Sequence, residues 1–123
     1  MKSLLFTFVL FIGYSSVAQI QLLGVVDFKK IEGNKNVLIV DVRTPYEYNS
    51  GHIQGAINID YYATDFKTQL SKLDHTLPIY IYCHSGVRSA KAAHTLKDLN
   101  FMKIYDLDGG IVAWKKAGYR TVK

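Results

Sequence analysis

The residues with the clearest chemical potential lie around Cys83, the only cysteine of the 123-residue chain. Cys83 follows an apolar run, 79–82, and Arg88 lies five positions after it, where a helix-forming segment opens. The loop between them consists of His84, Ser85, Gly86 and Val87. Because the chain offers no second cysteine for an intramolecular disulfide, this placement favours a reactive thiolate. We expect covalent chemistry at the sulfur of Cys83.

Three features of the loop favour a thiolate over a neutral thiol. Sites in open α/β sheets form at the carboxyl ends of strands, where successive backbone N–H groups can converge on an anion. The amino terminus of the following helix adds partial positive charge, and Arg88 adds a full one. Gly86 allows a positive φ and a close approach of the backbone to a substrate. The alternative interpretation of Cys83, an inert core thiol at a strand end, does not account for this electropositive setting.

Apolar runs and helical patterns alternate along the chain, and they define the scaffold that positions the loop. The expected strands are 36–42, 56–59, 79–82 and 103–107, with an edge strand at 21–25. The expected helices are 26–32, 44–50, 65–73, 89–99 and 111–117. Continuous apolar strands such as 36–42 are typical of a sheet buried on both faces. The alternation predicts one α/β domain with a mostly parallel sheet.

Several polar residues near the loop have two interpretations each. Asp41 ends a strand near the expected site, and it either orients Arg43 or the loop, or serves the fold alone. Arg43 and Glu47 are four positions apart, so we expect an ordinary ion pair at a helix start. Ser89 caps the following helix, as its residue type favours, or donates a hydrogen bond to the sulfur. For His84 we expect a solvated side chain and not a general base.

Composition limits the classes of ligand. The histidines and the single cysteine lack the paired spacing of zinc ligands, so we expect no metal and no cofactor. Lys and Arg outnumber Asp and Glu by 15 to 10, but they form no tract of the kind that binds nucleic acid. The mild basic excess suits a small anionic substrate. We expect Trp114 to be a core residue and the turn 108–110 to lead into the last helix without a catalytic part.

The start of the chain has the order of regions found in a secretory signal peptide. A short, positively charged start precedes the almost entirely apolar run 4–12, and Ser16 and Ala18 occupy the −3 and −1 positions of a cleavage after Ala18. The alternative is a membrane anchor, but a bilayer span needs about 20 apolar residues and this run is about half as long. We therefore expect a signal at 1–18, a domain at 22–123, a periplasmic or secreted protein, and no stable membrane span after cleavage.

Three stretches of the chain resemble the signatures of rhodanese-like sulfurtransferases. The run 83–88 is similar to the active loop of that family, 38–59 to its amino-terminal signature, and 107–119 to its carboxyl-terminal signature. The three occur in the family's order and together cover about 22–122. The resemblance implies a three-layer α/β domain, in which a central, mostly parallel sheet of five strands is flanked by helices.

The same resemblance implies a mechanism. Cys83 would take the outer sulfur of a donor such as thiosulfate and release sulfite, and the resulting persulfide would pass the sulfur to cyanide, a thiol or a sulfur-accepting protein. The loop 84–88 would hold the persulfide, with Arg88 binding the anionic donor or bracing the loop. Ser85 and Ser89 are the candidate hydrogen-bond donors to the sulfur.

Two other function classes stay open at this point. A rhodanese-like domain can be a non-catalytic module that carries sulfur or binds a partner, because fold does not determine function. Phosphatases of the dual-specificity cell-cycle type have a related fold, but their loops place five residues between the cysteine and the arginine. Here only four residues separate Cys83 from Arg88, which makes a smaller cradle and favours a sulfur atom over a phosphoryl group.

Overall fold

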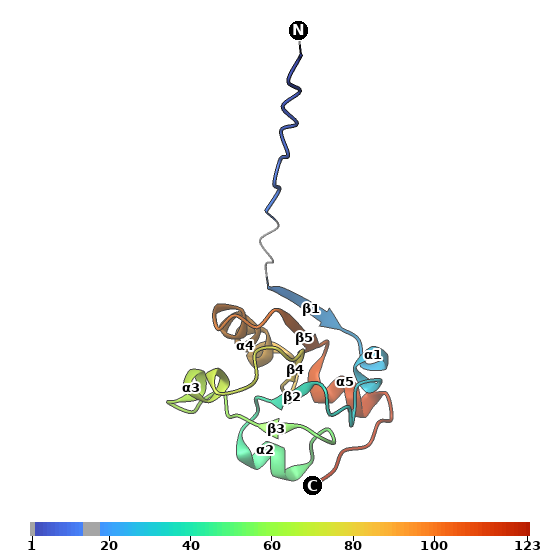
Figure 1. Ribbon diagram of the computed structural model, residues 1–123. Helices are drawn as coiled ribbons and strands as arrows, with labels where there is room; N and C mark the ends of the chain where they lie inside the picture. Colours follow the sequence, from blue (N-terminus) through green and yellow to red (C-terminus); the bar gives the residue numbers. More distant parts are fainter. Residues whose placement is uncertain (1, 14–17) are drawn as a thin grey trace.

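The computed structural model describes residues 2–13 and 18–123, and the described domain alternates strands and helices (Figure 1). The strands are β1 (Gln19–Leu23), β2 (Leu38–Asp41), β3 (Ile57–Asn58), β4 (Ile79–Tyr82) and β5 (Lys103–Leu107). The helices are α1 (Val25–Lys29), α2 (Pro45–Ser50), α3 (Phe66–Ser71), α4 (Val87–Asp98) and α5 (Gly110–Lys116). The five strands form one sheet in the order β1-β5-β4-β2-β3, and every pair is parallel. The predicted α/β domain with a parallel sheet is confirmed.

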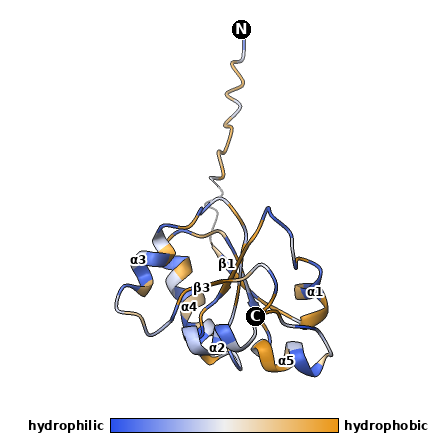
Figure 2. Ribbon diagram, turned by 90° about the horizontal axis from the view of Figure 1, so that it is seen from below, coloured by the Kyte–Doolittle hydropathy of each residue, from blue (hydrophilic) through white to orange (hydrophobic). Residues whose placement is uncertain are grey.

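Alternate residues of the strands face two separate apolar cores, one on each side of the sheet. Helices α3 and α4 cover the first face, which includes Ile79, Ile81 and Ile104. Helices α1 and α5 cover the second face, which includes Tyr82 and Leu107. Figure 2 shows the apolar side of α5 and the apolar strands between the helices. The central strands are therefore buried on both faces, as continuous apolar runs predict.

The helix starts differ from the expected ones in a way that matters for the site. Helix α4 begins at Val87, two residues earlier than expected, because Gly86 takes a left-handed conformation with φ of 112° and turns the chain directly into the helix. Helix α2 begins as expected: Thr44 is its N-cap, Pro45 its first residue, and Thr44 and Glu47 form a capping box. The loop after Cys83 is consequently shorter than the sequence suggested.

The start of the chain forms no helix or strand over residues 2–13, and its large apolar side chains are exposed. Ser16, part of the expected cleavage site, lies outside the described residues. Among the residues that the structure describes, no helix is both long and apolar enough to cross a membrane.

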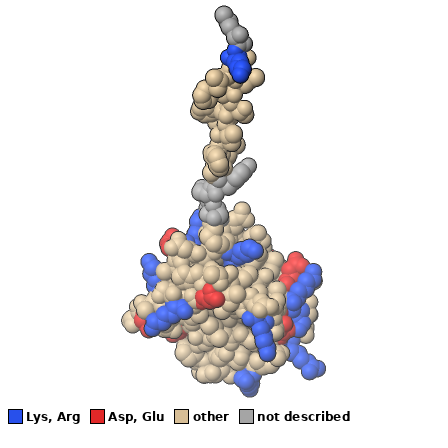
Figure 3. Space-filling model, viewed as in Figure 1, with Lys and Arg blue, Asp and Glu red and all other residues tan. Residues whose placement is uncertain are grey.

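Charged side chains are interspersed on the face of the molecule drawn in Figure 3. Lys and Arg side chains lie scattered over that face with Asp and Glu side chains between them. A mixed surface of this kind produces no strong field of one sign over the visible face.

Candidate active site

Cys83 directly follows β4, and its side chain is 1% exposed. Its Sγ accepts a hydrogen bond from the backbone N–H of Gly86 at 3.1 Å. Sγ also lies 3.5 Å from Oγ of Ser89, in the first turn of α4. A backbone N–H that points at a sulfur can stabilise negative charge that develops on that sulfur during a reaction.

Helix α5 holds the backbone of this loop from the other side. The N–H of Ile111 donates to the carbonyl of Cys83 at 3.0 Å, and the N–H of Val112 donates to the carbonyl of His84 at 3.1 Å. Gly110 has a φ of 59°, and a Cβ there would lie 2.5 Å from the carbonyl oxygen of His84. The turn into α5 thus needs glycine to pack against the loop. The turn 108–110, expected to have no catalytic part, therefore positions the loop, and the pair of glycines at the start of a helix is the sequence signal for this role.

Arg88 braces the loop by pairing with Glu47. Its Nη1 and Nη2 donate to the two carboxylate oxygens at 2.7 and 2.9 Å, and the guanidinium lies over the ring of Tyr62 at 5.8 Å. The hydrogen bond from Arg88 lowers the pKa of Glu47 to about 2. The same pairing, and more weakly the nearby Cys83 sulfur, raises the pKa of Arg88. The positive charge near Cys83 is therefore fixed in place by a bidentate contact.

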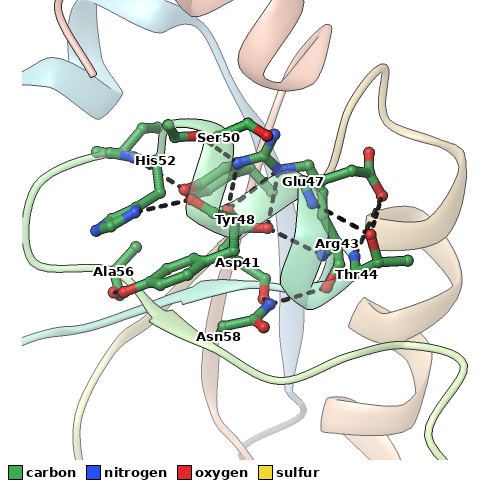
Figure 4. Close-up of polar contacts among 12 residues, drawn as sticks. Asp41, Arg43, Thr44, Glu47, Tyr48, Ser50, His52, Ala56 and Asn58 are labelled. Atoms are coloured by element: carbon green, nitrogen blue, oxygen red, sulfur yellow. Dashed lines mark hydrogen bonds and ion pairs between the residues drawn. The ribbon is translucent and has the colours of Figure 1, made fainter. Parts of the chain in front are cut away.

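The expected ion pair between Arg43 and Glu47 is wrong. Arg43 precedes the N-cap of α2 and lies outside the helix, where its Nε and Nη2 donate to Asp41 at 2.8–3.1 Å and Nη2 also reaches the carbonyl of Gly51 at 2.6 Å (Figure 4). Asp41 is fully buried, and the Arg43 guanidinium lies 5.8 Å from the ring of Tyr82, on the sheet face opposite Cys83. Asp41 and Arg43 therefore tie the chain after β2 to the end of α2.

Ser89 does not cap α4, which corrects the expected role. Gly86 occupies the N-cap position, and Ser89 is the third residue of the helix. Its hydroxyl is fully buried and donates to the carbonyl of Gly86 at 3.3 Å. The second interpretation, a hydrogen bond from Ser89 to the sulfur, places Ser89 correctly, but the observed direction is the reverse: Sγ of Cys83 donates to Ser89 Oγ at 3.5 Å.

The remaining loop residues face outward. His84, Ser85 and Val87 are exposed, as the interpretation of His84 as a solvated side chain predicted. The structure thus brings Gly86 and Ser89 to the sulfur of Cys83, while Arg88 lies nearby in its pair with Glu47. Within residues 2–13 and 18–123, no group of three His, Cys, Asp or Glu side chains could hold a metal ion.

One buried acid beside the site was not predicted from the sequence. Asp106 of β5 is 4% exposed, and its Oδ1 has no hydrogen-bond partner among the described side chains and backbone. Burial, with a smaller contribution from Asp108, raises the pKa of Asp106 to about 6, and the hydroxyl of Ser89 acts in the opposite direction. The period of two along β5 places Asp106 on the same face as Ile104, which is the signal that could have revealed it.

Comparisons with known proteins give related sequences of several kinds. The chain is 38% identical over 82 residues to an uncharacterized protein, YqhL, of Bacillus subtilis, and 36% identical over 83 residues to thiosulfate sulfurtransferase GlpE of Shewanella oneidensis. These alignments cover 67% and 68% of the chain, and 64% and 80% of the two relatives. A tRNA uridine(34) hydroxylase of Pelagibacter ubique is 36% identical over 90 residues, which are 72% of the chain but only 30% of that enzyme. The chain thus spans less than two thirds of the length of some of the relatives that it matches.

Solved structures and a family model agree on the fold. The structure superposes on a rhodanese-related protein from Thermoplasma volcanium with a TM-score of 0.73 and 28% sequence identity, covering 83% of this chain and 97% of that one. The family model described as the rhodanese-like domain matches residues 25–117. The chain is a member of the rhodanese-like domain family.

Proposed function

We propose that this protein is a sulfurtransferase that carries sulfane sulfur on Cys83, with thiosulfate as a competent donor. The observation that carries the proposal is the hydrogen bond from the N–H of Gly86 to Sγ of Cys83 at 3.1 Å, inside the short loop between β4 and α4. The similarity to thiosulfate sulfurtransferase GlpE supports it.

The proposed reaction has two displacement steps at sulfur. The Cys83 thiolate attacks the outer sulfur of thiosulfate, the S–S bond of the donor breaks, and sulfite leaves with the bonding electron pair. An acceptor thiolate or cyanide then attacks the outer sulfur of the persulfide, and the second S–S cleavage regenerates the Cys83 thiolate. Neither step needs a metal or an external oxidant.

The state of Arg88 favours this chemistry over phosphate ester hydrolysis. Nη1 and Nη2 each donate one N–H to Glu47, so the end of the guanidinium that would bind two phosphoryl oxygens side by side already holds a carboxylate. The guanidinium still supplies positive charge near Cys83. A fixed charge and a backbone donor are sufficient to stabilise a small sulfur anion.

The test is to incubate the protein with thiosulfate and to measure intact mass and released sulfite. We expect a mass gain of one sulfur atom with release of an equal amount of sulfite, and loss of the added mass when cyanide or a thiol is supplied. Cys83→Ser should show neither change. Lys91→Ala, which alters an exposed side chain of α4, is the matched control and should behave as the unmodified protein does.

Two outcomes separate the alternatives. A persulfide that forms but is not discharged by cyanide or small thiols would indicate a sulfur carrier that needs a protein acceptor. Absence of any sulfur adduct, together with turnover of an aryl phosphate, would overturn the proposal in favour of a phosphatase.

We also propose that the protein acts in the periplasm or after secretion. The exposed apolar side chains within 4–12 support this proposal, since an apolar segment of that length is typical of a signal peptide. Expression of the full chain in a Gram-negative host, followed by fractionation and amino-terminal sequencing, tests it. The expected product is periplasmic and begins at Gln19; a cytosolic product that begins at Met1 would contradict it.

A further inference from the structure

Gln19 is the first residue of β1, and it is also the residue that the proposed cleavage after Ala18 leaves at the amino terminus. An amino-terminal glutamine has an option that most residues lack, because its own α-amino nitrogen can reach the side-chain amide carbon and close a five-membered ring. The inference below rests on the proposed export of the protein and not on the chemistry of Cys83.

The surroundings of Gln19 leave its side chain free to close this ring. Gln19 is exposed, so its side chain can turn back toward its own nitrogen without leaving the core. The nitrogen donates to the carbonyl of Met102 at 3.3 Å. This distance is longer than most hydrogen bonds between nitrogen and oxygen, so the contact holds the nitrogen only loosely.

A second positive charge lies next to the new amino terminus. Strand β1 pairs with β5 in parallel, and Gln19 is in register with Lys103, whose side chain is also exposed. Cleavage gives Gln19 an α-ammonium group, so two positive charges then occupy neighbouring positions of adjacent strands, where like charges repel. This repulsion favours the neutral amine, which is the nucleophile, and ring closure removes the charge of the terminus altogether.

We propose that Gln19 of the exported protein is a modification site, at which the amino terminus cyclises to pyroglutamate with the help of the charge of Lys103. The neutral α-amino nitrogen attacks Cδ of the Gln19 side chain, the N–Cδ bond forms, and the Cδ–Nε2 bond breaks. The amine gives one proton to the departing nitrogen, which leaves as ammonia. Nothing is oxidised or reduced, and no co-reactant is consumed.

The ring would protect an edge strand on which both cores depend. Strand β1 lies at one edge of the sheet, where Ile20 packs against the core under α3 and α4 and Leu23 packs against the core under α1 and α5. An aminopeptidase needs a free α-amino group to remove the first residue of a chain, and pyroglutamate has none. Cyclisation therefore blocks the stepwise removal of β1 from its exposed start.

The start of β1 is remote from the sulfur of Cys83. The strands of the sheet are parallel, and Cys83 follows the carboxyl end of β4, so Gln19 at the amino end of β1 lies at the opposite end of the sheet. Cyclisation should therefore leave the release of sulfite from thiosulfate unchanged. A failure of this proposal and a failure of sulfur transfer are separate results.

The test is the intact mass of the exported product after expression of the full chain in a Gram-negative host. A product that begins at Gln19 should be lighter than the open chain by about 17 Da, the mass of ammonia. Gln19→Met, with a side chain of similar length but no amide, is the matched control and should have the open-chain mass.

A second preparation makes the result independent of signal cleavage. The same terminus, generated by proteolytic removal of a fusion partner in front of Gln19, should lose the same mass when the folded protein is incubated at neutral pH. A folded chain that begins at Gln19 and keeps its full mass in both preparations would overturn the proposal.

The part of Lys103 is tested by the rate of this mass loss in the fusion-derived chain. Lys103→Gln should slow the loss by about two- to threefold, the size expected of one exposed charge pair. Lys67→Gln removes an exposed charge on α3, away from β1, and should leave the rate unchanged. In urea the effect of Lys103→Gln should vanish, because the register of β1 with β5 is lost. An equal rate in the folded proteins, or the same slowing in urea, would overturn the role of Lys103.

Discussion

Two aspartates of the sheet are almost completely buried, and their surroundings are opposite. Asp41 ends β2 and receives hydrogen bonds from the backbone N–H, Nε and Nη2 of Arg43. Asp106 lies on β5 with one oxygen unpartnered, and its pKa is raised to about 6. The two carboxyl groups lie on opposite faces of one sheet and are buried to a similar extent. The difference between their surroundings therefore comes from their partners and not from their depth.

Asp41 is a buried carboxylate that is compensated by a cation, whereas Asp106 is a buried carboxyl group without such a partner. Asp41 is compensated by a full positive charge at hydrogen-bonding distance, and a compensated buried charge is tolerated because its partners replace the lost water. Asp106 has only a hydroxyl beside it, and that hydroxyl also touches the Cys83 sulfur. A buried acid without a compensating partner lowers the free energy of unfolding near neutral pH. Uncompensated groups of this kind are found mostly at functional sites.

The largest expected effect is the loss of the compensating charge of Asp41. Arg43→Met should lower the free energy of unfolding by about 3–5 kcal/mol, because it leaves a buried carboxylate without its cation. Urea unfolding at neutral pH measures this loss. Arg120→Met, at an exposed position, is the matched control and should change stability by less than about 0.5 kcal/mol. A loss below about 1 kcal/mol in Arg43→Met would remove the contrast between the two acids.

A substitution of Asp106 should have the opposite effect on the free energy of unfolding. Its pKa is about 6 in the folded protein and about 3.8 in the unfolded chain, so the folded state binds more protons between these values and its stability falls as pH rises through about 6. Asp106→Asn lacks this dependence and should be more stable than the unmodified protein by about 2–3 kcal/mol at about pH 8, with a difference near zero at about pH 4.

Urea unfolding at the two pH values, with Asp41→Asn in parallel, completes that test. Asp41→Asn should destabilise the protein at about pH 8, where Asp106→Asn stabilises it. If both substitutions destabilise by similar amounts, then the Asp106 carboxyl group is compensated in a way that its geometry does not reveal.

The scaffold was predictable from the sequence because its signals are local. The apolar runs of β4 and β5 gave the observed bounds of both strands, and the helix expected over 44–50 agrees with α2 and its N-cap Thr44. The position of Cys83 at the carboxyl end of β4 followed from the same patterns. Each of these inferences needs only residues that are close together in the chain.

The partners of the charged groups were not predictable because they are set by tertiary packing. Spacing suggested that Arg43 and Glu47 pair, but Glu47 pairs instead with a residue 41 positions away, at the start of α4. Ser89 has the residue type of a cap, yet the left-handed Gly86 starts the helix before it. Asp106 could have been placed in the core by its alternation with Ile104, whereas the lack of a partner for Oδ1 depends on which helix covers that face.

Glu47 has a compensating cation, as Asp41 has, but it is partly exposed to solvent. Its substitution should therefore have the smallest effect on stability of the three. Its carboxylate is partly exposed and paired with Arg88, which lowers its pKa to about 2. Because this folded pKa is below that of the unfolded chain, about 4.5, the pair contributes stability above about pH 4.5 that is lost as pH falls toward 2. Glu47→Gln should cost about 1–2 kcal/mol at neutral pH, since solvent screens the pair, and should cost little at about pH 2. Acid unfolding of both proteins measures the difference; an equal loss at both pH values would mean that Glu47 acts through the capping box with Thr44 and not through its charge.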